Sequence, residues 1–178
     1  PNHPTDNVKG VTASLLEGLS YGAGDAVLGL NPAIDNVKST TDILNLFNDV
    51  KSRLKIPTQI CVLSHITTQL KALKSGAPMD LCFQSIAGSE KALASFGTDV
   101  DMLAEANELM ASKGTSIGPN YMYFETGQGS ELSSNSHNGA DQLVMESRCY
   151  GLARHYNPFL VNTVVGFIGP EYIYDTKE

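Results

Sequence analysis

Glu125 is the residue whose type and surroundings point most directly to chemistry. It follows the apolar Phe124 and precedes the turn-forming segment 126–129, so an apolar wall and a tight turn flank a carboxylate. A carboxylate in such a place accepts charge-assisted hydrogen bonds from an ammonium or hydroxyl group of a small substrate. The alternative is that Glu125 caps the backbone turn that follows it and binds no ligand.

Polar residues also follow the other short apolar runs of the sequence. Ligands of parallel α/β folds bind at the carboxyl ends of the strands, so residues in these positions are candidates for one site. For each of them, the alternative is that a strand near a surface must end in something polar. Besides Glu125, the set comprises Asn31, Pro32, Ser64, His65, Gln84, Ser85, Thr126, Asn162 and Thr163.

The remaining motifs are weak. Gly127 and Gly129 resemble the start of a phosphate-binding turn, but Leu132 stands where a third glycine would complete the dinucleotide fingerprint. His65 is a candidate base or metal ligand, yet no second His or Cys lies at ligand spacing, which favours a hydrogen-bonded histidine at a helix start. No metal site is predicted, and no P-loop or nucleophile–base–acid order is present.

The elements that must position these residues alternate between strand and helix periodicity. Apolar residues on consecutive positions are typical of strands that are covered on both faces, whereas spacings of three and four indicate helices. Strands are predicted over 25–30, 59–63, 81–83, 121–124 and 159–165. Helices are predicted over 8–19 with Thr5 as N-cap, and over 43–54, 66–73, 89–96, 100–110 and 140–155.

This order, one helix, then strand and helix four times, then a strand, predicts a parallel sheet that is either open or closed into a barrel. A complete eight-stranded barrel needs about 250 residues, whereas this chain has 178. We therefore expect an α/β fold of the parallel TIM-barrel type with about five of the barrel strands, or a smaller open sheet. One compact unit over 1–178 is predicted, with the strand-end residues gathered at one edge of the sheet.

Composition excludes several classes of partner. Hydrophobic residues make up 42% and charged residues 17%, which suits a packed globular core. Twelve Lys and Arg against nineteen Asp and Glu give a formal net charge of -7, which argues against nucleic acid or an anionic membrane as the main partner. The sequence shows no membrane-spanning stretch or leader, and its three cysteines include no CxxC pair, so free thiols and a cytoplasmic location are expected.

Four strings together carry a resemblance to a known family. They are GDAVLGLNP at 24–32, FQSIAGSEK at 83–91, YFETGQGSELS at 123–133 and NTVVGFIGPEY at 162–172. In this order and at these separations they closely resemble the large, catalytic subunit of ethanolamine ammonia-lyase, and the similarity extends over all 178 residues.

The resemblance implies a TIM barrel and a radical reaction that converts ethanolamine to acetaldehyde and ammonia with adenosylcobalamin as cofactor. It also implies a small subunit as partner, a homo-oligomer of large subunits, and a cytoplasmic location that extends to a bacterial microcompartment. Matched position by position, the resemblance makes Asn31, Glu125 and Phe167 substrate contacts and gives Glu125 the catalytic role. It makes Pro32, Gln84 and Ser133 cobalamin contacts.

The family's Arg-x-Gln element and its substrate-binding aspartate would fall outside these 178 residues, so the chain is expected to be the middle of a barrel. The alternative function is therefore a catalytically incomplete barrel piece that acts only as a structural or assembly module. A third hypothesis is another TIM-barrel lyase or aldolase. It would require a Schiff-base lysine or a metal cluster at a strand end, and the sequence offers neither.

Overall fold

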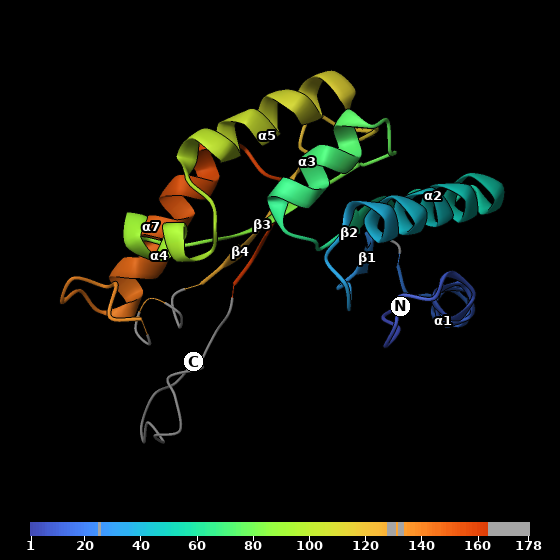
Figure 1. The fold of residues 1–178 in the computed structure, drawn as a ribbon, viewed down its shortest axis with the longest axis horizontal. Coiled ribbons are helices and arrows are strands. Elements are labelled where there is room, and N and C mark those ends of the chain that lie inside the picture. The colour runs from blue at the N-terminus through green and yellow to red at the C-terminus, as the bar shows by residue number, and fades with distance from the viewer. Residues whose placement is uncertain (25, 128–130, 132–133, 164–178) are drawn as a thin grey trace. The chain divides into compact units, whose positions relative to one another are not determined.

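A computed structural model describes residues 1–24, 26–127, 131 and 134–163 (Figure 1). The chain divides into two compact units. Unit 1 comprises Pro1–Gln84 and Ala104–Tyr121, and unit 2 comprises Ser85–Leu103 and the chain from Met122 onward. One strand and one helix contribute residues to both units, and the single-domain organisation stays a prediction.

Unit 1 is built around a pair of parallel strands, β1 and β2. Their register pairs Val27 with Gln59 and Leu30 with Val62. Leu81 continues the pairing, because its N–H donates to the carbonyl of Ile60 at 3.1 Å. The elements of this unit are α1 (Val8–Ser20), β1 (Val27–Leu30), α2 (Val37–Leu54), β2 (Gln59–Val62) and α3 (Ile66–Lys74), with the first part of β3 (Cys82–Ile86) and most of α5 (Val100–Lys113).

Unit 2 holds a sheet with the strand order β3–β4–β5. β4 and β5 are parallel. Bonds from Cys82 N to Tyr121 O and from Gly127 N to Ile86 O follow the same order along β3 and β4, so these strands are parallel too. The remaining elements are α4 (Glu90–Ser95), β4 (Met122–Thr126), α7 (Gln142–His155) and β5 (Leu160–Asn162).

The predicted α/β class, the parallel strands and the order of elements are confirmed, whereas two parallel sheets of two and three strands do not by themselves establish a barrel. β3 and β4 continue past their predicted ends to Ile86 and Thr126. They do so because backbone pairing does not require apolar side chains. β1 begins at Val27 rather than at residue 25, and the predicted strand residues 164 and 165 lie outside the described residues.

Side-chain caps decide where the first two helices begin. Thr5 is not the N-cap of α1, because Asp6 has a φ of 52° and interrupts any helix before it. Asn7 caps the helix instead, accepting from the N–H groups of Lys9 and Gly10. Asn36 likewise caps α2, which starts six residues before the apolar pattern predicted. Helix starts therefore follow capping groups more closely than apolar spacing.

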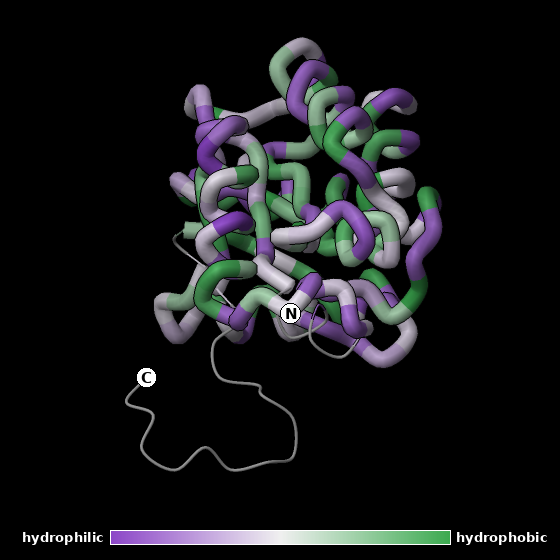
Figure 2. The backbone as a smooth tube through the Cα atoms, turned by 90° about the vertical axis from the view of Figure 1, so that its left-hand side faces the viewer, coloured by the Kyte–Doolittle hydropathy of each residue, from purple (hydrophilic) through white to green (hydrophobic). Residues whose placement is uncertain are grey.

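The core of each unit follows the burial patterns of the elements. All four residues of β2 are buried, as expected of a strand covered on both faces, whereas buried and partly exposed residues alternate along β4. Figure 2 shows hydrophobic and hydrophilic residues alternating around the helical turns, as in amphipathic helices. In α2, Ile43, Leu44 and Phe47 form the buried face. Within the described residues, no helix combines the length and apolar character that crossing a membrane requires.

Asp80 is a buried carboxylate that joins three segments of unit 1. Its Oδ2 accepts from Lys51 Nζ at 2.5 Å and from the N–H of Ile60 at 2.9 Å, and its Oδ1 accepts from Thr115 Oγ1 at 2.7 Å. The Asp80 side chain is fully buried and the Lys51 side chain is only 13% exposed. Removing one partner of a buried ion pair leaves an unpaired buried charge.

We predict that Asp80→Asn lowers the free energy of unfolding by about 3–5 kcal/mol, because Lys51 loses its counter-charge while remaining largely buried. The matched control is Asp42→Asn, which removes an exposed i,i+4 pair with Lys38 and should cost at most about 0.5 kcal/mol. Urea unfolding of both variants measures the difference. Equal costs would show that the Asp80 network does not stabilise the unit.

All three cysteines, Cys61, Cys82 and Cys149, are free and buried, as expected of reduced thiols that behave as small hydrophobes. Burial raises the pKa of Cys82 and of Cys149 to about 12, from 9.0. Burial also raises the pKa of Cys61 well above its ordinary value, with further contributions from Cys82 and Asp80.

These shifts predict a loss of stability in alkali. Between pH about 9 and 12 the unfolded chain releases thiol protons that the folded chain retains, so the free energy of unfolding falls as pH rises through this window. The slope is about 1.4 kcal/mol per pH unit and per buried thiol. We expect Cys149→Ala to make the pH dependence shallower by about this amount in urea titrations at pH 9 to 11. An unchanged slope would contradict the prediction.

Candidate functional site

Three polar side chains meet near the carboxyl ends of β3, β4 and β5. Glu125 and Asn162 are register partners across the parallel pair β4–β5. Asn162 Nδ2 donates to Glu125 Oε1 at 3.2 Å, and Ser85 Oγ donates to Glu125 Oε2 at 3.5 Å. Ser85, Glu125 and Asn162 all belong to the set that the sequence placed at strand ends, and this part of the predicted cluster is confirmed.

The pleat of β4 determines the face on which Glu125 lies. Successive side chains of a strand point to opposite faces. Phe124 is fully buried and packs against Tyr156, the C-cap of α7, with ring centroids 5.8 Å apart. Glu125 is therefore directed to the face opposite α7, where it is only partly buried.

The Glu125 carboxylate is held by neutral donors. An amide and a hydroxyl group contact its two oxygens, and among the described residues none of the Lys or Arg side chains forms an ion pair with it. No described Lys or Arg side chain therefore neutralises its negative charge through an ion pair. Such a group is suited to binding a small cation, because a charge-assisted hydrogen bond is stronger than a neutral one.

Asn31, Pro32 and Gln84 belong to unit 1. Asn31 is exposed directly after β1, and its N–H donates to Asn2 Oδ1 at 2.9 Å. Gln84 is buried, and its Oε1 accepts from the N–H of Ile66, the first residue of α3, at 3.2 Å. Ser133 and Phe167, the other two predicted contacts, lie outside the described residues. The roles of all five residues stay predictions.

His65 is the N-cap of α3, in agreement with its expected place at a helix start. Its Nδ1 accepts from the N–H of Thr67 at 3.2 Å. The described residues contain no group of three or more His, Cys, Asp or Glu side chains that could hold a metal ion.

Gln69 is a residue that sequence reasoning missed. It is fully buried, its Nε2 donates to the carbonyls of Ser64 and Phe83 at 2.6 Å each, and its Oε1 accepts from the N–H of Phe83 at 2.9 Å. The amide thus ties the segment after β2 to the start of β3, next to Gln84. The sequence contains a signal for it, because Gln69 is a polar residue on the apolar face of α3, between Ile66 and Leu73. A polar side chain in such a position is buried and must find hydrogen-bond partners.

The loops after β3 and β4 are joined by a buried carboxylate. Glu131 Oε2 accepts from the N–H of Gly88 at 3.0 Å, and the carbonyl of Gly88 accepts from Arg148 Nε of α7 at 2.5 Å. Gly88 also lies against the backbone of α7, because a Cβ at this position would lie 2.5 Å from the carbonyl oxygen of Met145. Only glycine fits this close approach.

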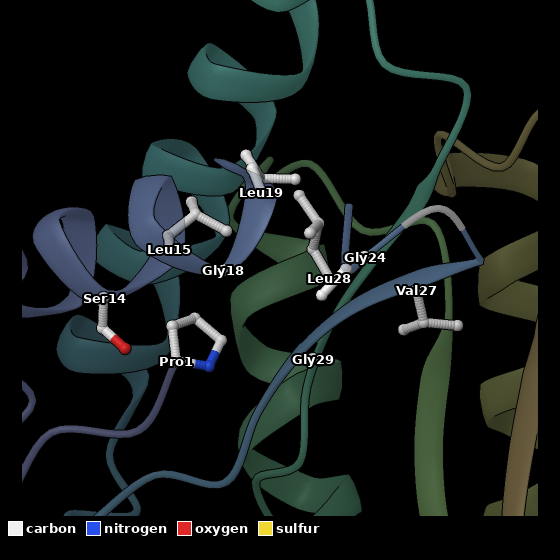
Figure 3. Close-up of a pocket in the computed structure, with 10 residues that line it drawn as sticks. Pro1, Ser14, Leu15, Gly18, Leu19, Gly24, Val27, Leu28 and Gly29 are labelled. Carbon is white, nitrogen blue, oxygen red and sulfur yellow. The ribbon is translucent and has the colours of Figure 1, made fainter. Parts of the chain in front are cut away.

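Unit 1 also contains a cavity of about 340 Å³ between α1 and β1 (Figure 3). Leu15 and Leu19 of α1 and Leu28 of β1 contribute apolar side chains to its wall. Neither Asn31 nor Pro32 lines it. The cavity is therefore separate from the predicted site residues that follow β1.

We predict that Gly88→Ala destabilises the protein by about 1–3 kcal/mol, because the added methyl group forces the loop and α7 apart. The control is Gly151→Ala in α7, where an added Cβ meets nothing within 4 Å and should stabilise the helix by about 0.5–1 kcal/mol. Thermal unfolding of the two variants gives the sign of each change in stability. A stabilising effect of Gly88→Ala would contradict the close approach of Gly88 to the backbone of α7.

Comparison with known proteins agrees with the resemblance noted from the sequence. The family model of the ethanolamine ammonia lyase large subunit (EutB) matches residues 1–178. Ethanolamine ammonia-lyase large subunits from Salmonella typhimurium and Escherichia coli K12 are 54% and 53% identical over the whole chain. The chain spans 39% of the length of these relatives. It belongs to the ethanolamine ammonia-lyase large-subunit family.

Proposed function

We propose that this chain is part of an ethanolamine ammonia-lyase, an enzyme that converts ethanolamine to acetaldehyde and ammonia. The observation that carries the proposal is Glu125, a carboxylate near the end of β4 that is oriented by Asn162 and Ser85 and has no ion pair to a described Lys or Arg. Ethanolamine is a small cation at neutral pH. A fixed carboxylate between neutral donors is the partner that its ammonium group requires.

Each proposed substrate contact has a separate task. Glu125 accepts hydrogen bonds from the substrate ammonium, and Asn31 holds the polar end of the molecule. Phe167 forms an apolar wall of the pocket. Such contacts fix the orientation of a small flexible substrate, and orientation of the reacting groups lowers the barrier to reaction.

The family implies adenosylcobalamin as cofactor, and the described members of its predicted contact set suit such a ligand in type. Pro32 offers a partly exposed apolar ring after β1, and Gln84 offers an amide whose orientation is fixed by the bond to Ile66. Ser133 would add a hydroxyl group. When bound, the cofactor supplies the radical that abstracts a substrate hydrogen, and the protein supplies position and electrostatics.

The wider context of the enzyme is part of the same proposal. Parallel strands connected by helices in both units support a TIM barrel as the complete fold. The name of the relatives as large subunits supports a small subunit as partner. A homo-oligomer of large subunits and a cytoplasmic or microcompartment location complete the proposal. Family membership and the contacts of Glu125 favour the lyase over the alternative of a barrel piece that serves only assembly.

The decisive substitution is Glu125→Gln in the full-length protein. It preserves size but removes the charge and directs an amide N–H toward a cation. We expect ethanolamine turnover to fall by about tenfold to a hundredfold from the loss of a hydrogen bond to a charged group, with a further loss from poorer positioning. Cobalamin affinity, measured by absorbance titration, should remain within about threefold, a difference of less than 1 kcal/mol.

Gln84→Ala is the comparison variant, since Gln84 is assigned to the cofactor rather than to the substrate. It should weaken cobalamin binding more than Glu125→Gln does. Near-normal turnover by Glu125→Gln would refute its role as substrate contact. A larger loss of cobalamin affinity in Glu125→Gln than in Gln84→Ala would show that the two roles are wrongly assigned.

A further inference from the structure

The turn that carries Asn31 and Pro32 is held by side chains from the beginning of the chain. Asp6 Oδ1 accepts from the N–H of Ala33 at 2.9 Å, and Asp6 Oδ2 accepts from the N–H of Ile34 at 2.8 Å. The N–H of Asn31 donates to Asn2 Oδ1 at 2.9 Å. Proline has no N–H, so every backbone N–H from residue 31 to 34 donates to a side chain of segment 2–6.

Asp6 is itself held in a restricted conformation. It is only 6% exposed, and its φ of 52° lies in the left-handed region, which aspartate tolerates better than most residues but still adopts at a cost. Its own N–H donates to the carbonyl of His3 at 3.1 Å. Backbone conformations of this kind persist where the surrounding structure requires them, and they concentrate at functional sites.

The same turn is also connected to the next strand end. Asp35 Oδ2 accepts from the N–H of His65, the N-cap of α3, at 2.8 Å. The turn is thus attached on one side to segment 2–6 and on the other to the end of β2. Asn2 and Asp35 each make one of these contacts, whereas the Asp6 carboxylate accepts from two successive N–H groups. Two bonds to one carboxylate fix both the position and the orientation of the turn.

We propose that Asp6 is a positioning residue of the site, which fixes the turn that presents Asn31 to the substrate and Pro32 to the cofactor. The assignment of the two ligands rests on the proposed function, whereas the effect of Asp6 on the turn does not. Because neither Ala33 nor Ile34 has another backbone partner in a strand or helix, removing the carboxylate frees the peptide groups next to Asn31 and Pro32.

The test uses Asp6→Ala and Asp6→Asn in the full-length protein, with Asp42→Ala as control. Asp42 is an exposed aspartate of α2 whose carboxylate contacts Lys38 and does not reach the turn. Hydrogen exchange followed by mass spectrometry reports on the amides of 33 and 34. We expect exchange there to accelerate at least tenfold in Asp6→Ala and by less in Asp6→Asn, which retains one acceptor oxygen. Asp42→Ala should leave it unchanged.

Kinetics separate positioning from general stability. In Asp6→Ala, KM for ethanolamine should rise at least tenfold while the exchange of amides in α2 and α3 stays at the wild-type level, and Asp6→Asn should lie in between. The proposal is overturned if the turn amides exchange as in the wild type, or if both Asp6 variants accelerate exchange throughout unit 1. It is also overturned if KM matches that of Asp42→Ala. Should the wild-type protein fail to turn over ethanolamine, the proposed function and the ligand assignment fail, and the exchange data still decide the effect of Asp6 on the turn.

Discussion

Parallel pairing of β4 with β5 is the constraint on which the candidate site depends. The register places Glu125 beside Asn162, and the pleat directs Phe124 to the opposite face, against Tyr156 at the C-cap of α7. A slip of one residue would exchange the faces, burying a carboxylate under α7 and exposing an aromatic ring. The burial of Phe124 therefore supplies the free energy that keeps Glu125 in place, although the two side chains do not lie on the same face.

Buried side chains complete the hydrogen bonding of the backbone where strand pairing leaves N–H groups without a partner. Asp6 accepts from the turn after β1, Asp80 accepts from β2, and Glu131 accepts from the loop after β3. Gln69 performs the same task for Phe83 with an amide. Each of these groups accepts from a backbone N–H that has no backbone partner of its own. The loops that carry candidate site residues are thus shaped by long-range contacts rather than by local turn preferences.

The difference between local apolar patterns and long-range side-chain contacts explains what the sequence could and could not predict. The strands, the order of elements and the strand-end positions of Ser85, Glu125 and Asn162 follow from short-range apolar patterns, and the structure agrees with them. The cap of α1 was missed because Thr5 and Asn7 are both capable residues, and the choice depends on the left-handed conformation of Asp6. That conformation is in turn stabilised by bonds to Ala33 and Ile34, which no local pattern reveals.

The surroundings of two carboxylates show how residues of one chemical class serve different purposes in this chain. Asp80 is fully buried and pairs with Lys51, so its charge is neutralised within the protein and its contribution is to stability. Glu125 is partly exposed and is held by an amide and a hydroxyl group, so its orientation is fixed while its charge is not neutralised by them. Neutral donors of this kind bring no positive charge of their own, so they leave the charge of the carboxylate available to a cation. A small ammonium ion at Glu125 would therefore gain the full charge-assisted interaction, which Asp80 already makes within the fold.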